Sequence, residues 1–126
     1  MSYKFQKLEI YQLALDYLDL LYELAARLPR CEDFNLKSQM PRAGTSTVLN
    51  IAEGSTGQSD PEQSRFLGMA LRSLIETVAC QDVIERRKYL SAEELQPSRE
   101  LGKKLFAKIQ AMRRALGPRR PVTAGR

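Results

Sequence analysis

The stretch Asn50-Ile51-Ala52-Glu53-Gly54 ends one predicted helix and leads into a turn. Helical apolar spacing precedes it over residues 36–53, and Gly54-Ser55-Thr56-Gly57 is rich in residue types that favour turns. Gly54 predicts a C-terminal cap, because glycine adopts the left-handed conformation at little cost. A long helical run begins near Asp60, so this stretch is predicted to be the hinge of a helical hairpin.

Three further helices are predicted on either side of this hinge. The first covers 6–28 and stops before Pro29. The third covers 60–88 and begins at Ser59-Asp60-Pro61-Glu62, which combines a capping box with a first-turn proline. The fourth covers 92–116, between the capping box Ser91-Ala92-Glu93-Glu94 and the terminating pair Gly117-Pro118.

These four helices define the predicted fold class. No segment alternates as a strand does, and the connections between the helices are short. The sequence therefore predicts an all-α protein, an antiparallel up-down-up-down four-helix bundle over residues 1–117. Residues 118–126 have almost nothing to bury and are predicted to form a disordered basic tail.

The first predicted helix carries two apolar seams, which is more than one small bundle buries from a single helix. One seam holds Leu8, Tyr11, Leu15, Leu18, Tyr22 and Ala25. The other holds Ile10, Leu13, Tyr17, Leu21, Leu24 and Leu28. Burial of the surplus seam against a second subunit predicts a homo-oligomer. The alternative is a helix central to its own bundle.

The second predicted helix contains the small residues Ala43-Gly44-Thr45-Ser46-Thr47. Such residues let neighbouring helices approach closely, and close packing is the preferred interpretation. A Ser–Lys nucleophile that uses Lys37 is the alternative. Pro41 is expected either to kink this helix or to mark its true first turn.

The composition argues against most enzyme classes. The 126 residues include no histidine, the commonest general base and transition-metal ligand, and only two isolated cysteines, Cys31 and Cys80. We therefore expect no metal, no cofactor and no enzymatic activity. Neither a signal peptide nor a membrane-length apolar run is present, which predicts a cytoplasmic protein with reduced thiols.

The positive charge is concentrated at the C-terminal end. Residues 99–126 hold nine basic residues and one acidic residue, a net +8, so the rest of the chain carries −3 of the overall +5. This asymmetry indicates a polyanionic partner, and the alternative is a solvated helix face. On a helical wheel, Arg99, Lys103, Arg113 and Arg114 lie opposite the apolar seam, with Lys104 and Lys108 flanking it. The candidate nucleic-acid-binding residues are Arg99, Lys103, Lys104, Lys108, Arg113, Arg114, Arg119 and Arg120.

Two features of the hinge region have competing interpretations. Gly54-Ser55-Thr56-Gly57 matches the GxxG of nucleic-acid-binding KH loops, but those domains need strands, and a tight interhelical turn is preferred. Asn50 and Glu53 share one helix face, and Arg65 is predicted to reach Glu53 across the hairpin. A catalytic carboxylate pair of Glu53 and Glu76 is the alternative use of these acids.

Several of these segments together resemble a known family. The NIAEG sequence at 50–54 resembles the signature of four-helix-bundle proteins encoded in 23S ribosomal RNA intervening sequences. Segments elsewhere in residues 5–90 agree: FQKL at 5–8, YQLA at 11–14, Q-x-x-R-A at 39–43 and RFL-x-x-A-x-x-S-L-x-E at 65–76. The structural residues of this resemblance are Arg42, Asn50, Glu53, Gly54, Arg65 and Glu76. Pro41, Val48 and Arg72 depart from the family pattern.

The resemblance implies an antiparallel four-helix bundle, and related bundles assemble as homopentamers. The same superfamily includes the accessory variability proteins of diversity-generating retroelements, which are basic pentamers that bind nucleic acid and a reverse transcriptase. No defined biochemical activity follows from the intervening-sequence proteins themselves.

These observations predict a non-enzymatic, homo-oligomeric bundle that binds RNA or DNA phosphates through the basic fourth helix and the tail. If six phosphates are neutralised, the logarithm of the affinity falls with the logarithm of the salt concentration at a slope of about −5 for duplex DNA. The alternative is a protein-interaction scaffold that recruits a partner such as a reverse transcriptase. A third hypothesis, a hydrolase, requires a cleft built from Glu53, Glu76 and a lysine.

Overall fold

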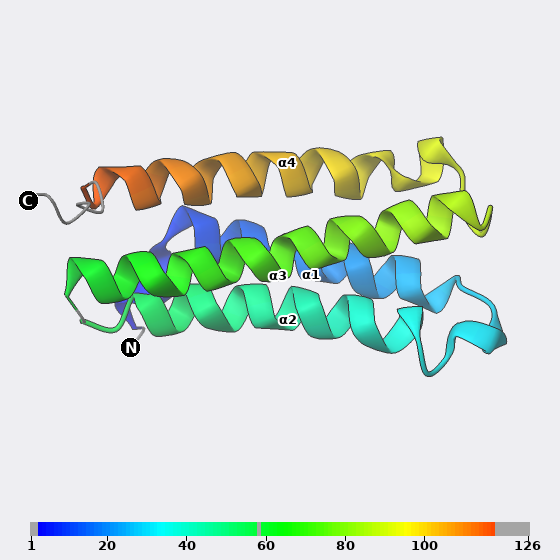
Figure 1. The fold of residues 1–126 in the computed structure, drawn as a ribbon, viewed down its shortest axis with the longest axis horizontal. Helices are drawn as coiled ribbons and strands as arrows, with labels where there is room; N and C mark the ends of the chain where they lie inside the picture. The colour runs from blue at the N-terminus through cyan, green and yellow to red at the C-terminus, as the bar shows by residue number, and fades with distance from the viewer. Residues whose placement is uncertain (1–2, 58, 118–126) are drawn as a thin grey trace, which may run out of the picture.

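A computed structural model describes residues 3–57 and 59–117 as four α-helices, with no strand in these ranges. The helices are α1 (Glu9–Ala26), α2 (Leu36–Gly54), α3 (Asp60–Arg86) and α4 (Ala92–Ala115). Two short 3-10 turns, η1 (Lys4–Lys7) and η2 (Arg30–Glu32), precede α1 and α2 (Figure 1). The predicted all-α class and the number of helices are confirmed.

Local capping interactions set the helix ends near the predicted positions. The Ser59 side chain accepts a hydrogen bond from the Glu62 amide at the start of α3. Ser91 and Glu94 form a complete capping box at the start of α4, with hydrogen bonds of 3.1 and 2.8 Å. Gly117 follows α4 with a φ of 101°, the left-handed conformation expected of a terminating glycine.

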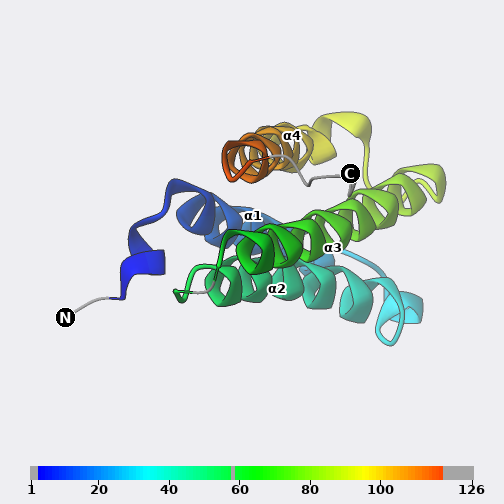
Figure 2. The same cartoon turned by 60° about the vertical axis from the view of Figure 1, so that its left-hand side comes forward.

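Each helix contacts two neighbours and lies diagonal to the remaining one. α1 and α3 both contact α2 and α4. In Figure 1 the chain runs along α1, returns along α2, runs out again along α3 and returns along α4, and Figure 2 shows α4 lying over α1 and α3. Large side chains from all four helices fill the centre, including the fully buried Leu21, Ile51, Leu74 and Ile109.

The two seams of α1 have different environments. The seam from Ile10 to Leu28 faces the core, with all its members buried except the half-buried Leu13. In the other seam Leu15 and Leu18 are half-buried against the core, while Tyr22 is 54% exposed. This single chain therefore leaves part of the second seam in contact with solvent.

Glycines in α2 act through close packing rather than through left-handed backbone. Gly54 is the last residue of α2, and a Cβ at this position would lie 2.8 Å from the Phe66 Cβ. The prediction that Gly54 is a left-handed cap is wrong, because the positive φ of 91° occurs at Gly57 instead. At Gly44 a Cβ would lie 2.7 Å from Leu21 Cδ1, which confirms the close packing expected of the small-residue run.

Two further predictions concern Pro41 and the C-terminal tail. α2 begins at Leu36 and continues through the buried Pro41, so the interpretation of Pro41 as the first turn is wrong. The predicted tail from Pro118 to Arg126 lies outside the described residues.

Candidate nucleic-acid interface

The core side of α4 determines how its basic residues are presented. Leu95, Leu105 and Ile109 are fully buried. Gly102 lets α4 approach α1 closely, because a Cβ there would lie 3.1 Å from the ring of Tyr17. With this side fixed against the core, the cations at other positions lie either beside α1 and α3 or on the outer face.

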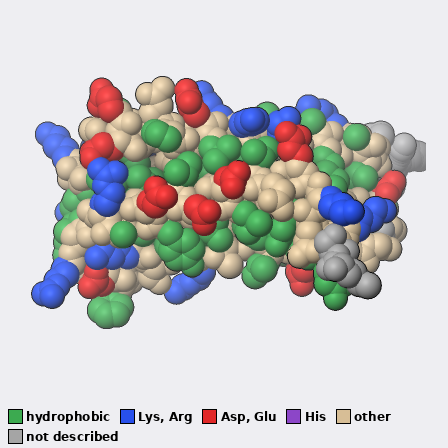
Figure 3. All heavy atoms as spheres, turned by 180° about the vertical axis from the view of Figure 1, so that it is seen from behind, with side chains coloured by type: hydrophobic (Ala, Val, Ile, Leu, Met, Phe, Trp, Pro, Cys, Tyr) green, Lys and Arg blue, Asp and Glu red, His purple; other side chains and the backbone are tan. Residues whose placement is uncertain are grey.

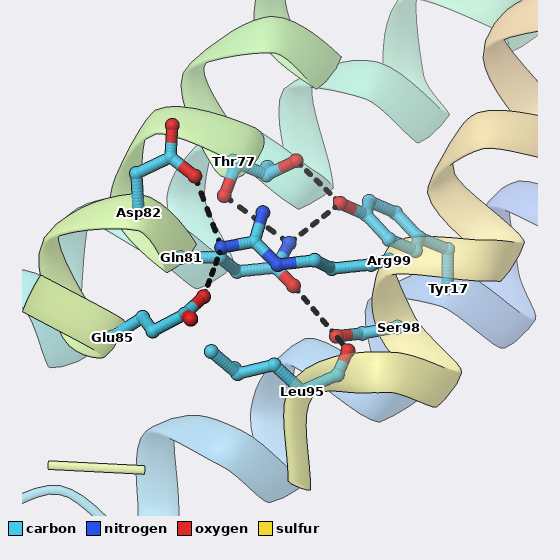
Figure 4. A network of polar contacts seen from close by, with 8 residues as sticks. All are labelled: Tyr17, Thr77, Gln81, Asp82, Glu85, Leu95, Ser98 and Arg99. Carbon is cyan, nitrogen blue, oxygen red and sulfur yellow. Dashed lines mark hydrogen bonds and ion pairs between the residues drawn. The ribbon is translucent and has the colours of Figure 1, made fainter. Parts of the chain in front are cut away.

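Three of the predicted binding residues interact with the protein itself. Arg99 forms ion pairs of 3.0 Å with Asp82 and 3.1 Å with Glu85 on α3 (Figure 4). Lys108 pairs with Glu9 of α1 at 3.3 Å. Arg113 donates from Nε to Ser64 Oγ at 3.1 Å, and its guanidinium lies against Gly68, where a Cβ would be 2.8 Å away. These interactions reduce the availability of the three cations for a ligand.

The other described candidates, Lys103, Lys104 and Arg114, are exposed. No ion pair joins any of the three to another residue within 3–57 or 59–117. Arg119 and Arg120 lie outside the described residues. The exposed cations on α4 are therefore the part of the predicted interface that the structure leaves open to solvent.

Two basic residues of α4 lie elsewhere than the helical wheel predicts. Arg99 and Arg113 were predicted to lie opposite the apolar seam, but both are half-buried on the α3 side. The buried face of α4 includes the small residues Ser98 and Gly102 beside the large apolar ones. Because Ser98 and Gly102 face the core, Lys104 lies on the outer face of the helix.

The interhelical polar link at the hinge uses different residues from those predicted. Asn50 is buried, and its amide donates to the Ser46 backbone oxygen at 2.9 Å and to Ser46 Oγ at 3.2 Å. Ser46 Oγ in turn lies 2.8 Å from Ser73 Oγ on α3. The hydrogen bonds from Asn50 to Ser46 and between Ser46 and Ser73 thus connect α2 to α3. The sequence did not predict this role for either serine.

The predicted Glu53–Arg65 pair is wrong. Arg65 pairs with Glu62 at 3.2 Å on its own helix, and its guanidinium carbon lies 4.8 Å from the centroid of the Phe66 ring. Glu53 is exposed at the end of α2. Of the remaining structural residues, Arg42 donates to Ser38 Oγ at 2.9 Å, and Glu76 is exposed on α3.

A buried polar network that the sequence analysis missed connects three helices (Figure 4). Gln81 Nε2 donates to Tyr17 Oη at 3.0 Å, and Ser98 Oγ donates to Gln81 Oε1 at 2.6 Å. Tyr17 Oη also lies 2.7 Å from Thr77 Oγ1, and burial raises the pKa of this tyrosine. Thr77 and Gln81 stand four residues apart on the core side of α3, a spacing that could have revealed the network.

An open groove between α3 and α4 adds two cations that the sequence analysis did not place in the interface. Its wider part, of about 560 Å³, is lined by Arg65 and Arg72 of α3 together with Arg113 of α4. A narrower apolar part of about 250 Å³ extends toward Tyr17 and Lys103. Ile75 and Phe106 line both parts, so they form one continuous α3–α4 groove.

The described ranges hold neither a metal-binding cluster nor a membrane-spanning helix. Residues 3–57 and 59–117 contain no group of three or more side chains suited to metal binding. None of the four helices is long and apolar enough to cross a membrane.

The fold and the cation pattern define a class of all-α proteins with four helices, the last of which exposes basic residues that form no ion pair with the described part of the chain. The chain belongs to the 23S rRNA-intervening sequence protein family, whose model matches residues 6–111. The match confirms the resemblance and extends it into α4.

One solved structure supports the fold. The chain is similar to the crystal structure of a protein of unknown function from the S23 ribosomal protein family of Bacteroides thetaiotaomicron VPI-5482. The TM-score is 0.75 at 21% identity, and the match covers 82% of this chain and 96% of that chain. No functionally curated protein matches the chain.

Proposed function

We propose that this protein is an oligomeric, non-enzymatic helical bundle that binds the phosphates of RNA or DNA through α4. The observation that supports this function is the set of three exposed cations, Lys103, Lys104 and Arg114, with no ion-pair partner among the described residues. Exposed cations of this kind release condensed counterions when they neutralise phosphates, which favours binding.

Contacts of this kind carry little sequence information. Phe106, the aromatic residue of α4, packs against the core and lines the α3–α4 groove, so it offers no stacking platform on the outer face that carries Lys104 and Arg114. We therefore expect weak sequence preference and binding that depends strongly on salt. The tail residues Arg119 and Arg120 belong to the same proposal as additional phosphate contacts.

The proposal includes an antiparallel up-down-up-down arrangement of the helices and a homopentamer. Contacts between α1 and α4 support the antiparallel order, because Glu9 pairs with Lys108 while Arg27 pairs with Glu94. The half-exposed seam of α1 supports an oligomer, since Tyr22 remains 54% exposed in the single chain. The number five comes only from the family resemblance.

A salt titration of binding to a labelled duplex DNA, followed by fluorescence anisotropy, tests the function. We expect the three α4 cations of each protomer to contribute about −2.7 to the slope of the log–log plot, from about 0.9 per contact. The triple variant Lys103→Ala, Lys104→Ala and Arg114→Ala should abolish most of this contribution. A salt-independent affinity, or a triple variant that binds as the wild type does, would overturn the proposal.

A matched control separates the α4 face from net charge. Lys4, Lys7 and Arg30 are exposed and lie outside α4, and replacing all three by alanine removes the same charge. This control should retain most of the affinity. Equal losses in both triple variants would show that net charge, not the α4 face, determines binding.

The second candidate function is a protein-interaction scaffold, and the α3–α4 groove favours it. Met69 and Ile75 are 37% and 52% exposed there, which suits a protein partner better than a phosphate backbone. Affinity capture from nuclease-treated lysate distinguishes the two functions. A partner retained without nucleic acid supports the scaffold.

We propose that the protein acts in the cytoplasm and is not an enzyme. The carboxylates of the hydrolase hypothesis, Glu53 and Glu76, are both exposed, and neither lines the α3–α4 groove. This geometry favours the non-enzymatic function over a catalytic cleft built from the two carboxylates. Hydrolysis of an RNA or ester substrate that is lost on Glu53→Gln and Glu76→Gln substitution would overturn the non-enzymatic assignment.

A further inference from the structure

The outer face of α1 carries an acidic stripe, which we define as Asp16, Asp19 and Glu23. The three carboxylates repeat at three-and-four spacing, so they project from one side of the helix, and all three are exposed. No ion pair joins them to another residue in the described ranges, although both ends of the α1 segment are paired, Glu9 with Lys108 and Arg27 with Glu94. Figure 3 shows acidic side chains crossing this side of the molecule among hydrophobic ones.

The α3–α4 groove has the complementary character. Arg65, Arg72 and Arg113 surround its wider part, and Met69 and Ile75 contribute exposed apolar surface. Arg72 has no ion pair with any residue the structure describes, and the Arg65–Glu62 pair is an exposed pair within one helix, which exchanges at little cost. The groove is therefore a basic and partly apolar surface with no acidic partner for Arg72 among residues 3–57 and 59–117.

The spacing of the charges agrees on the two surfaces. Asp16 and Glu23 are seven residues apart on α1, and Arg65 and Arg72 are seven residues apart on α3. At 1.5 Å per residue both intervals measure about 10.5 Å, or two helical turns. A helix that lies along the groove can therefore place both carboxylates beside both guanidinium groups at once.

The two surfaces of one chain cannot meet each other. α1 and α3 are diagonal in the bundle, since each contacts α2 and α4 instead. Their outer faces consequently point away from one another. Only a second molecule can bring an acidic stripe to the groove.

We propose that the acidic stripe of one copy docks into the α3–α4 groove of a second copy. The contact joins two different surfaces, so repeated docking produces a ring when the rotation closes. The half-exposed Leu15 and Tyr22 beside the stripe meet Met69 and Ile75, and this apolar contact favours a helix over a phosphate backbone as the occupant. The inference rests on the proposed oligomer and is independent of nucleic-acid binding.

Charge reversal tests this pairing in the full-length protein. With Asp16 beside Arg65 and Glu23 beside Arg72, Arg72→Glu and Glu23→Lys each place like charges together across the contact, while the double variant restores opposite charges in every contact of the ring. We expect each single change to weaken assembly by about tenfold, and the double change to recover it. The measurement is molar mass by light scattering across a range of micromolar concentrations, against a protomer mass of 14.3 kDa.

Arg86→Glu is the matched control, because Arg86 is exposed on α3 but does not line the groove. This variant should assemble as the wild type does. Circular dichroism melts of all variants check that the bundle remains folded.

Each alternative result overturns a specific part of the inference. Single variants that keep the wild-type mass, or a double variant that stays dissociated, would overturn the pairing while leaving the oligomer intact. An Arg72→Glu variant that keeps its mass but loses DNA binding would make the groove a phosphate site. A wild-type mass of one protomer would overturn both this contact and the proposed oligomer, but not the proposed DNA binding, which anisotropy measures separately.

Discussion

Tyr17 of α1 and Thr77 of α3 share a buried hydrogen bond of 2.7 Å between their side-chain oxygens. This bond joins the two diagonal helices through the centre of the bundle. Gln81 and Ser98 extend the contact to α4, so one polar network fixes the relative position of three helices. Arg99 of α4 lines the same groove as Tyr17 and Gln81 and forms ion pairs with Asp82 and Glu85 of α3 (Figure 4).

Tyr17→Phe is expected to destabilise the protein. The change keeps the ring but leaves the Gln81 amide and the Thr77 hydroxyl without one buried partner, which costs about 1–3 kcal/mol. Urea denaturation measures this loss. Tyr22→Phe on the same helix is the control and should change the free energy of unfolding by less than about 0.5 kcal/mol, because Tyr22 is 54% exposed. Equal stability of the two variants would show that the network contributes nothing.

Gly54→Ala and Gly68→Ala are expected to differ in sign. At Gly54 the new methyl group meets the Phe66 Cβ at 2.8 Å, and the resulting overpacking destabilises by about 1–3 kcal/mol. At Gly68 it meets only the Arg113 guanidinium, which can swing away, so the higher helix propensity of alanine stabilises α3 by up to about 1 kcal/mol. Thermal unfolding of both variants, at one protein concentration, gives the comparison. A stabilising Gly54→Ala would contradict the packing account.

Lys88→Gly is expected to stabilise the protein. Lys88 follows α3 with a φ of 63°, and the left-handed conformation costs a residue with a Cβ about 1–2 kcal/mol. Part of this gain is offset because glycine also gives the unfolded chain more freedom. The matched change Lys104→Gly, inside α4, should instead destabilise by about 1 kcal/mol. Denaturant midpoints that move in the same direction for both variants would refute this prediction.

Glu32 contributes to the stability of the folded protein, and this contribution is lost at acid pH. The hydrogen bond from Tyr89 Oη, at 2.8 Å, and that from Asn35 lower the pKa of the Glu32 carboxyl. Because the folded pKa is below the unfolded value of about 4.3, the contribution is present above that pH and is lost as pH falls through the folded pKa. Glu32→Gln should therefore reduce stability at neutral pH and approach the wild type in acid.

Tyr89→Phe provides an independent check of the same interaction. It removes the hydrogen bond that lowers the pKa of Glu32 most, so its stability difference from the wild type should also shrink as pH falls. Unfolding free energies measured from neutral pH down to about pH 3 test both variants. A difference that stays constant over this range would exclude the linkage.

Helix boundaries were predictable because capping is local. Ser91 and Glu94, three residues apart, satisfy each other's backbone groups without help from the rest of the fold. The α-helical start at Glu9 was less predictable, since η1 occupies Lys4–Lys7 and interrupts the periodic pattern. The NIAEG sequence also identified the family, which the match over residues 6–111 confirms.

The sequence predicted the positive charge of the candidate interface, but not which of its cations are free to contact a ligand. The sequence contains the α4 cations, yet Arg99, Lys108 and Arg113 contact acids or a hydroxyl that lie 14, 99 and 49 positions away in the chain. The sequence marked Arg72 only as a departure from the family pattern and did not predict it in the interface. Its place beside Arg113 in the groove depends on how α3 and α4 pack.

The sequence by itself determined the four helices, the capped starts of α3 and α4, the family and the basic character of α4, because each depends on residues that are neighbours along the chain or on composition. Only the tertiary structure decided that Asn50 connects to Ser73 through Ser46 while Glu53 and Arg65 remain apart. The physical reason is helix rotation. A turn of a few tens of degrees about the axis exchanges one polar partner for another, and that angle is set by core contacts such as Gly102 against Tyr17.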